Sequence, residues 1–268
     1  MPIVSLDDVI ASAKQTLTYT KVTAQTTVAA TWSSVFDRAG NPGAGTLAGT
    51  SITAGVVPTA ATAGCPSINT FAVGARGYIS NIDFGNSVAC RMALFGMLFK
   101  AGAYAFNAAQ ALTAQPTFAS RVSFNGGSPN YRGLQLWVEI VTVTTGALTV
   151  TVTYTNELGV TGRSTGAFAT PAGAGASRLF QMPLQAGDSG VQQITNVTGT
   201  VATVGAFNVL ILRPIWSGRV RSANDGGSHG LDLTGLAEVF VDSAILLAIA
   251  PDSTSSGSPD LTIEIAVK

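Results

Sequence analysis

The strongest constraint on the fold of this chain is an unbroken alternation of apolar residues and threonine over residues 148–155. The apolar residues are Leu148, Val150, Val152 and Tyr154, and a threonine follows each of them. A period of two places the two sets on opposite faces of an extended strand. Threonine is β-branched and fits a pleated surface, so the outer face is polar without being charged. The pattern predicts a strand with one buried face.

Turns and further strands follow this segment. The sequence Asn-Glu-Leu-Gly at residues 156–159 is rich in turn formers, and the chain from Val160 onward can return as the second strand of a hairpin. Glycine, proline and serine turns separate further predicted strands, which cover residues 178–184, 191–204, 206–216, 237–250 and 261–267. This spacing predicts a mainly β protein, with an antiparallel β-sandwich body of jelly-roll-like form.

The N-terminal segment has the features of a short helix over residues 5–17. Ser5 can cap it, Asp7 and Asp8 lie in the first turn, and Leu6, Val9, Ile10 and Ala13 share one face. A helix of this length with so narrow an apolar face is marginal in isolation. It therefore needs a surface to dock on, either its own body or a neighbouring protein.

Residues 37–63 consist mostly of glycine, alanine, proline and threonine. The segment is too long for a tight turn and offers few side chains to bury, which predicts an extended arm or a loop that lies along another surface. We therefore divide the chain into an N-terminal helix and arm, residues 1–63, and a sandwich body, residues 64–268. The candidate partner-interface residues are apolar side chains of the first region: Leu6, Val9, Ile10, Trp32, Phe36, Leu47 and Ile52.

Residues 86–114 form the most apolar stretch, rich in alanine, methionine, leucine and phenylalanine. Arg91 and Lys100 divide it into runs shorter than the ~20 residues that a membrane-spanning helix needs. Buried strand, buried helix, or one of each remain open, because short apolar runs do not reveal their period. Gly96 and Gly102 favour strands with bends.

Charged residues are few. There are 28 among 268 residues, or 10%, and their net charge is zero; an ordinary soluble domain has about 25%. A monomer of this mass exposes on the order of 10,900 Å², which gives about one charged residue per 390 Å² of surface. Either threonine (32 residues) and glycine (30 residues) solvate much of that surface, or neighbouring subunits cover it. Zero net charge favours association, and we expect a homo-oligomer.

The same composition excludes several classes of protein. Without a lysine or arginine cluster the chain has no means to neutralise phosphates, so we expect no nucleic-acid partner. No membrane partner is expected either. The first 17 residues carry acids where a signal peptide needs basic residues, so we expect no signal-directed secretion. Cys65 and Cys90 are too few for a disulfide scaffold and are predicted to be buried free thiols.

No constellation predicts catalysis. His229 is the single histidine, and Asp225 and Asp232 lie near it, but a Gly-Gly pair in the same stretch is typical of a flexible polar loop. A serine nucleophile needs a histidine base, but Ser228 is the sequence neighbour of His229, which usually aims the two side chains apart. The chain also has no nucleophile elbow. The tryptophans lie far apart in the sequence and are interpreted as core or interface anchors. We expect no enzyme, no catalytic residue, no cofactor and no metal.

Several fragments resemble virion structural proteins of tailed bacteriophages. They are WSSVFDRAGNPGAGTLAG (32–49), LWVEIVTVTTGALTVTVTYTNELGVTGRST (136–165), MPLQAGDSGVQQITNVT (182–198) and FNVLILRPIW (207–216), and the segment TYTNELGVTGRST is the most specific. The resemblance implies a β-rich accessory protein of the particle, built in the host cytoplasm and located in the virion. Some such proteins decorate or cement the head.

The favoured hypothesis from the sequence is a capsid cement or decoration protein that binds the major capsid protein or other virion proteins. The resemblance also implies a homotrimer, because cement proteins commonly lie at local threefold axes. A tail, neck or adaptor component is the alternative. A carbohydrate-binding or carbohydrate-hydrolysing particle protein is the third hypothesis.

Overall fold

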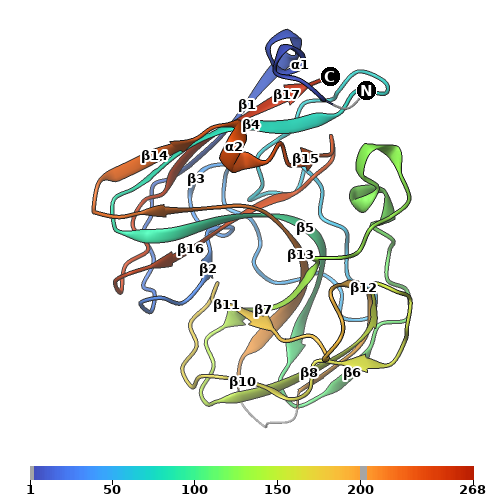
Figure 1. Cartoon of the computed structure of the whole chain (residues 1–268). Helices are drawn as coiled ribbons and strands as arrows, with labels where there is room; N and C mark the ends of the chain where they lie inside the picture. The colour runs from blue at the N-terminus through green and yellow to red at the C-terminus, as the bar shows by residue number, and fades with distance from the viewer. Residues whose placement is uncertain (1–2, 200–203) are drawn as a thin grey trace.

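The computed structural model describes residues 3–199 and 204–268. Three antiparallel sheets form the body, and a central one extends through most of it (Figure 1). Its strands, in order, are β11 (Leu179–Met182), β7 (Gln135–Thr142), β13 (Ala206–Val220), β5 (Cys90–Ala105), β16 (Ile245–Pro251) and β2 (Ser33–Ser34). β5 and β13 are its longest strands and pair from Cys90 opposite Val220 to Ala105 opposite Ala206.

Two further sheets pack against this central sheet. The second sheet contains β14 (Asp225–His229), β4 (Gly77–Asn86), β17 (Asp260–Val267), β1 (Ala13–Lys21) and β3 (Gly40–Asn41), and β15 (Glu238–Val239) also pairs with β4. The third sheet contains β10 (Phe168–Thr170), β8 (Leu148–Asn156), β12 (Val191–Gly199) and β6 (Ala109–Ala111), and β9 (Arg163–Ser164) pairs with β8. The helices are α1 (Leu6–Ala11) and α2 (Leu231–Thr234), with 3-10 turns at Ala119–Val122 and Phe124–Gly126.

The central sheet takes part in three hydrophobic clusters, and it shares two of them with the other sheets. At the start of β5, Met92 and Leu94 pack with Ile82 and Ile263 of the second sheet. Further along β5, side chains such as Phe99 pack with the third sheet. Register shifts between β13 and β5 lie along this pair and let the long strands bend from one core to the other. The molecule is thus two β-sandwiches that share one sheet.

The alternating segment forms β8, as predicted, and the side chains of Val150, Val152 and Tyr154 are fully buried. The hairpin is also confirmed, because β9 returns beside β8 with Tyr154 opposite Arg163. The mainly β sandwich, the last strand and the strands with bends in residues 86–114 are confirmed as well. Cys65 and Cys90 are buried free thiols.

Two sequence predictions were wrong in their extent, and a third was wrong in the kind of structure. The helix predicted for residues 5–17 ends at Ala11, because from Ala13 the alternation of Leu17 and Tyr19 with threonine fits a strand. The cap is as predicted: Asp8 N donates to Ser5 Oγ at 3.2 Å. The strand predicted for residues 237–250 is split by a turn in which Ser243 N donates to Phe240 O. Residues 225–229, expected to be a flexible loop, form β14 beside β4.

Residues 37–63 pack on the protein's own body: Gly40–Asn41 form β3 of the second sheet, and residues 51–56 lie along the central sheet. Val56 and Lys100 exchange two backbone hydrogen bonds of 2.8 and 3.0 Å, and Gly102 N donates to Ser51 O at 3.1 Å. Phe36, just before the segment, is buried in a third apolar cluster with residues such as Leu210. In the isolated chain this segment is part of the folded body, and its contact with a neighbour stays a prediction.

Candidate interaction surface

Helix α1 presents part of its apolar face to solvent. The side chains of Leu6 and Ile10 are 60% and 70% exposed, whereas Val9 is buried against the body. Lys268, the last residue, forms an ion pair with Asp8 and so fastens the helix to the end of β17. This contact holds the pKa of the Asp8 carboxyl at about 2, chiefly through the hydrogen bond from Lys268. The helix is anchored by one residue of its apolar face and leaves two uncovered.

The other candidate interface residues do not join this patch. Phe36 is buried, and Trp32 packs half-buried beside it in the third apolar cluster. Leu47 is half-buried, and its carbonyl accepts a hydrogen bond from Asn208 Nδ2 at 2.6 Å. Ile52 is 39% exposed. These four residues lie along the central sheet, so the structure separates them from α1.

Strand β1 follows α1 directly and has an unpaired edge. It pairs with β17 from Ala13 to Thr20, but on its other side it pairs with β3 only at Thr20 and Lys21. Within residues 3–199 and 204–268, no strand pairs with the outer edge of residues 13–19. Such an edge offers backbone N–H and C=O groups to another chain. Sequence reasoning missed it because residues 13–17 were assigned to the helix.

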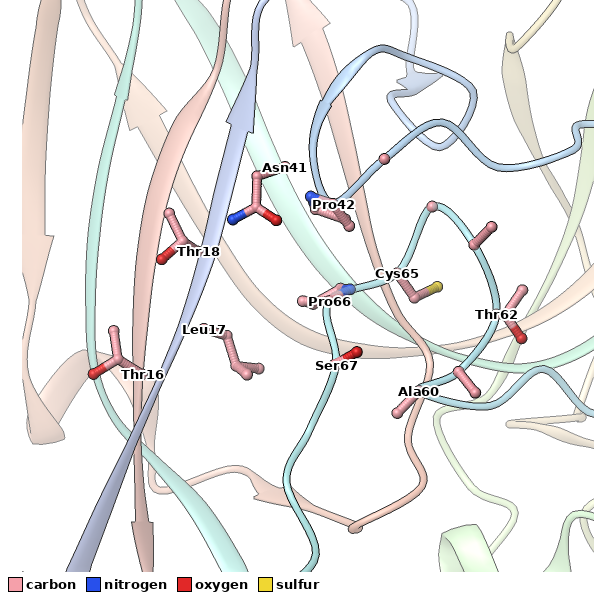
Figure 2. Close-up of a pocket in the computed structure, with 14 residues that line it drawn as sticks. Thr16, Leu17, Thr18, Asn41, Pro42, Ala60, Thr62, Cys65, Pro66 and Ser67 are labelled. Carbon is pink, nitrogen blue, oxygen red and sulfur yellow. The ribbon is translucent and has the colours of Figure 1, made fainter.

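A pocket of about 470 Å³ borders the same strand (Figure 2). It is lined by residues 16–18 of β1, residues 41–43 and residues 60–67. In Figure 2, Leu17 points toward the segment that carries Pro66 and Ser67. Burial raises the pKa of the Cys65 thiol in this lining to about 12, so it stays protonated and is a poor nucleophile. The pocket adds recessed polar surface beside the edge but no reactive group.

Two lysines next to α1 and the edge of β1 are paired with acids. Lys14 Nζ lies 3.2 Å from Glu264 Oε1 across the β1–β17 pair, and Lys268 takes Asp8. Both pairs cancel their own charge. Asp7 of α1 is exposed and takes part in none of the ion pairs among the described residues, so the surface around Leu6 and Ile10 combines apolar side chains with one acid. Such a mixed surface suits a protein partner.

The histidine region makes structural contacts. Trp216 Nε1 donates to His229 Nδ1 at 2.9 Å, and both rings pack edge-on against Phe84. Asp225 instead contacts Ser222 Oγ at 3.2 Å. In the part of the chain that the structure describes, no group of three or more His, Cys, Asp or Glu residues is placed to hold a metal ion.

The three tryptophans, distant in sequence, line one depression of about 480 Å³. Trp137 and Trp216 are only 3% and 6% exposed, and Trp137 Nε1 already donates to Gln135 Oε1 at 3.0 Å. A sugar stacks on an exposed aromatic face, and these two indoles offer little of one. Trp137 and Trp216 are core anchors, in line with the sequence interpretation, although their separation along the chain hid their proximity.

Comparison with known proteins gives little. No protein-family model and no curated protein matches the chain. Among solved structures, "Structure of infectious bursal disease virus Gt strain" has a TM-score of 0.20 and 12% identity, over 96% of this chain and 81% of that one. "Crystal structure of infectious bursal disease virus VP2 subviral particle" has a TM-score of 0.18 and 11% identity, over 96% and 80% of the two chains. Likenesses this weak carry no argument about fold or function.

None of the described helices is long and apolar enough to cross a membrane.

Proposed function

We propose that this chain is a structural protein of a virus particle, and specifically a cement or decoration protein that binds the capsid of a tailed bacteriophage. The observation that carries the proposal is the combination of Leu6 and Ile10, exposed on α1, with the unpaired edge of β1 that follows directly. Apolar side chains and an open strand edge are two recurring means of binding another polypeptide. The sequence resemblance to phage virion proteins names the class of partner, the major capsid protein or its neighbours.

The low density of charged residues on the protein surface supports an assembled state. The chain exposes 10687 Å², close to the area expected from its mass. Several of its 28 charged residues are withdrawn from this surface because they are buried: Lys21, Lys100, Arg121, Glu139 and Glu238. The charge density is therefore even lower than the sequence implied. A neutral surface of this kind opposes nucleic-acid binding and favours protein contacts.

The proposed contact is shallow, and its strength comes from repetition. Covering one leucine or isoleucine side chain completely is worth about 1.5–3 kcal/mol, so one copy of the α1 patch binds weakly. Subunits that are linked into an oligomer bind a lattice together, and their weak contacts multiply. We propose a homotrimer for this reason and because the resemblance implies threefold positions. The protein would assemble in the host cytoplasm, remain in the virion, and act without cofactor or enzymatic turnover.

The test compares two variants for binding to capsids assembled without this chain. The double variant Leu6→Ser/Ile10→Ser removes the exposed face of α1, and the double variant Val73→Ser/Leu233→Ser is the matched control at exposed sites elsewhere (106% and 58%). We expect at least about a tenfold loss of capsid affinity for the α1 variant, unchanged unfolding for both, and wild-type binding for the control.

Equal capsid affinity of the wild type and the α1 variant would reject α1 as the docking element. Counting copies of the chain per particle tests the location. A copy number that matches the head lattice supports the cement role. A few copies per particle would place the chain in the tail, the neck or an adaptor.

A further inference from the structure

Three side chains with complementary chemistry meet on neighbouring strands of the central sheet. Lys100 lies on β5, Asn208 on the middle strand β13, and Glu139 on β7. Asn208 stands directly opposite Glu139 in the β13–β7 register. Lys100, Glu139 and Asn208 are 5%, 1% and 0% exposed. The cluster is separate from α1 and from the edge of β1.

One carboxylate oxygen of Glu139 contacts both of the other groups. Asn208 Nδ2 donates to Glu139 Oε2 at 2.8 Å, and Lys100 Nζ lies 3.5 Å from the same oxygen. The other oxygen, Oε1, accepts from Ser34 Oγ at 2.8 Å, which fixes the carboxylate plane. A single base is thereby placed between an amine and an amide nitrogen.

The carboxamide of Asn208 is oriented by the backbone. Its Oδ1 accepts from Gly49 N at 2.8 Å, and its Nδ2 donates to Leu47 O at 2.6 Å. Because a backbone N–H can only donate and a carbonyl can only accept, these contacts decide which end is oxygen. Gly102 makes room for it, since a Cβ there would lie 2.2 Å from Oδ1. The Gly49 N–H is placed to stabilise negative charge on Oδ1.

Lys100 is held in an apolar and nearly dry setting. Its Nζ lies 4.4 Å from the centroid of the Phe36 ring and donates to Thr46 O at 3.3 Å. A buried ion pair gains little stability over well-packed apolar residues, because both ions lose their hydration. Only an uncharged amine is nucleophilic, so Lys100 must first give a proton to a base, and Glu139 is the carboxylate that contacts it.

We propose that Lys100 and Asn208 join in an intramolecular isopeptide bond, with Glu139 as the proton carrier. Glu139 first takes a proton from Lys100 Nζ. The Nζ then attacks Cγ of Asn208, a Nζ–Cγ bond forms, and the Gly49 N–H stabilises the negative charge on Oδ1. Glu139 gives the proton it took from Lys100 to Nδ2, and then removes a second proton from the attacking nitrogen. The Cγ–Nδ2 bond breaks and ammonia leaves. Glu139 then returns its proton to the departing ammonia, which becomes ammonium.

This reaction balances without any oxidant or co-reactant. An ammonium group and a carboxamide become a secondary amide and one ammonium ion, and Glu139 ends as it began. Each molecule reacts once with itself, which is compatible with a protein that turns over no external substrate. The bond would tie β5 to β13 at the level where the central sheet passes from one core to the other.

The deciding experiment is mass spectrometry of the purified full-length protein. We expect an intact mass lower than the sequence mass by one ammonia, and a branched peptide that links Lys100 to residue 208 after digestion. Loss of ammonia alone is insufficient, because cyclisation at Asn125–Gly126 gives the same mass. The branched peptide is therefore the primary readout.

Variants separate chemistry from packing. Glu139→Gln preserves a polar side chain of the same shape but cannot carry the proton, so its mass should equal the sequence mass. Lys100→Arg should also restore the full mass, whereas Asn208→Asp should still form the bond and lose one water instead. The control Lys14→Arg alters an exposed lysine and should leave the bond intact.

The wild-type mass alone can overturn the proposal, so variants that fail to fold leave the test standing. Folded wild-type protein at its full sequence mass, with Lys100 and Asn208 recovered in unlinked peptides, means that no bond forms. A branched peptide that persists in Glu139→Gln would remove Glu139 from the reaction. Capsid binding is measured separately, so either proposal can fail without the other.

Discussion

The turn that contains Asp188 allows a sharp test of how the third sheet is stabilised. The Asp188 side chain is 2% exposed and accepts from Tyr154 Oη at 2.6 Å, Asn156 Nδ2 at 2.8 Å and Arg163 Nε at 2.9 Å. These donors lie on β8 and β9, and Asp188 lies in the turn before β12. One carboxylate therefore joins the predicted hairpin to the rest of its sheet.

We expect Asp188→Asn to lower the free energy of unfolding by about 2–4 kcal/mol at pH 7. A hydrogen bond to a charged group contributes about 1.5–3 kcal/mol, and three donors converge here. Asparagine keeps one acceptor and turns an NH2 group toward the donors. The full sum is not expected, because the three bonds are coupled and Arg163, 24% exposed, regains water.

The effect should depend on pH in a defined direction. Hydrogen bonding from Arg163 is the main cause that lowers the pKa of Asp188 from 3.8 to about 2. A carboxyl with a depressed folded-state pKa stabilises the fold above its unfolded pKa and loses this contribution as the pH falls through the folded value. The wild-type advantage over Asp188→Asn should be complete above pH 4 and shrink toward pH 2.

Urea unfolding followed by circular dichroism, at fixed ionic strength from pH 2 to pH 7, measures this difference. Asp260→Asn is the matched control, since that carboxylate is exposed and accepts one hydroxyl, Thr20 Oγ1, at 3.0 Å. We expect it to change stability by less than about 0.5 kcal/mol. The reasoning fails if Asp188→Asn matches this control at pH 7, or if its deficit is as large at pH 2 as at pH 7.

Three other perturbations test separate features. Burial raises the pKa of both thiols, that of Cys65 to about 12. Neither Cys65 nor Cys90 should therefore react with a thiol reagent at pH 8 until urea unfolds the chain. Rapid labelling of the native protein would contradict this prediction. Burial lowers the pKa of Lys21 from 10.5 to about 8, so the unfolded state binds more protons than the folded state between these pH values. The stability of the wild type relative to Lys21→Met should therefore rise with pH across this range. Parallel curves of stability against pH for the two proteins would refute this prediction. In Gly190→Ala the new Cβ would lie 2.0 Å from Tyr131 O. We expect the free energy of unfolding to fall by about 1–3 kcal/mol, measured by thermal unfolding. An unchanged melting temperature would show that the turn adapts.

The sequence was informative wherever a strand buries one face. Val150, Val152 and Tyr154 alternate with threonine because one side of β8 faces the core and the other does not. β5 was ambiguous because both of its faces are covered: Leu94 belongs to one apolar cluster and Phe95 to another. A strand buried on both sides has no alternation to read.

The buried cluster of Lys100, Glu139 and Asn208 was beyond sequence reasoning for a different reason. Lys100, Glu139 and Asn208 come from three strands, and only the order β7–β13–β5 makes them neighbours. No local pattern encodes that order. Lys100 leaves a local signal, because it is a charge inside a long apolar stretch. A buried charge needs a partner, and this one finds its carboxylate on another strand.

The contacts of residues 37–63 bear on where an interface can form. If this segment left the body to reach a neighbour, Asn208 would lose the Leu47 carbonyl and the Gly49 N–H, and Lys100 would lose the Phe36 ring if the movement extended to it. Each buried polar group left without a partner costs about 1–3 kcal/mol, so release is unfavourable unless the neighbour supplies equivalent groups. A second copy of the chain could do so only by exchanging the same segment. Helix α1 carries no such cost, because Leu6 and Ile10 are already exposed while Val9 holds the helix in place. In the proposed capsid complex, the first contact should therefore form at α1 and the edge of β1, with residues 37–63 still packed on their own body.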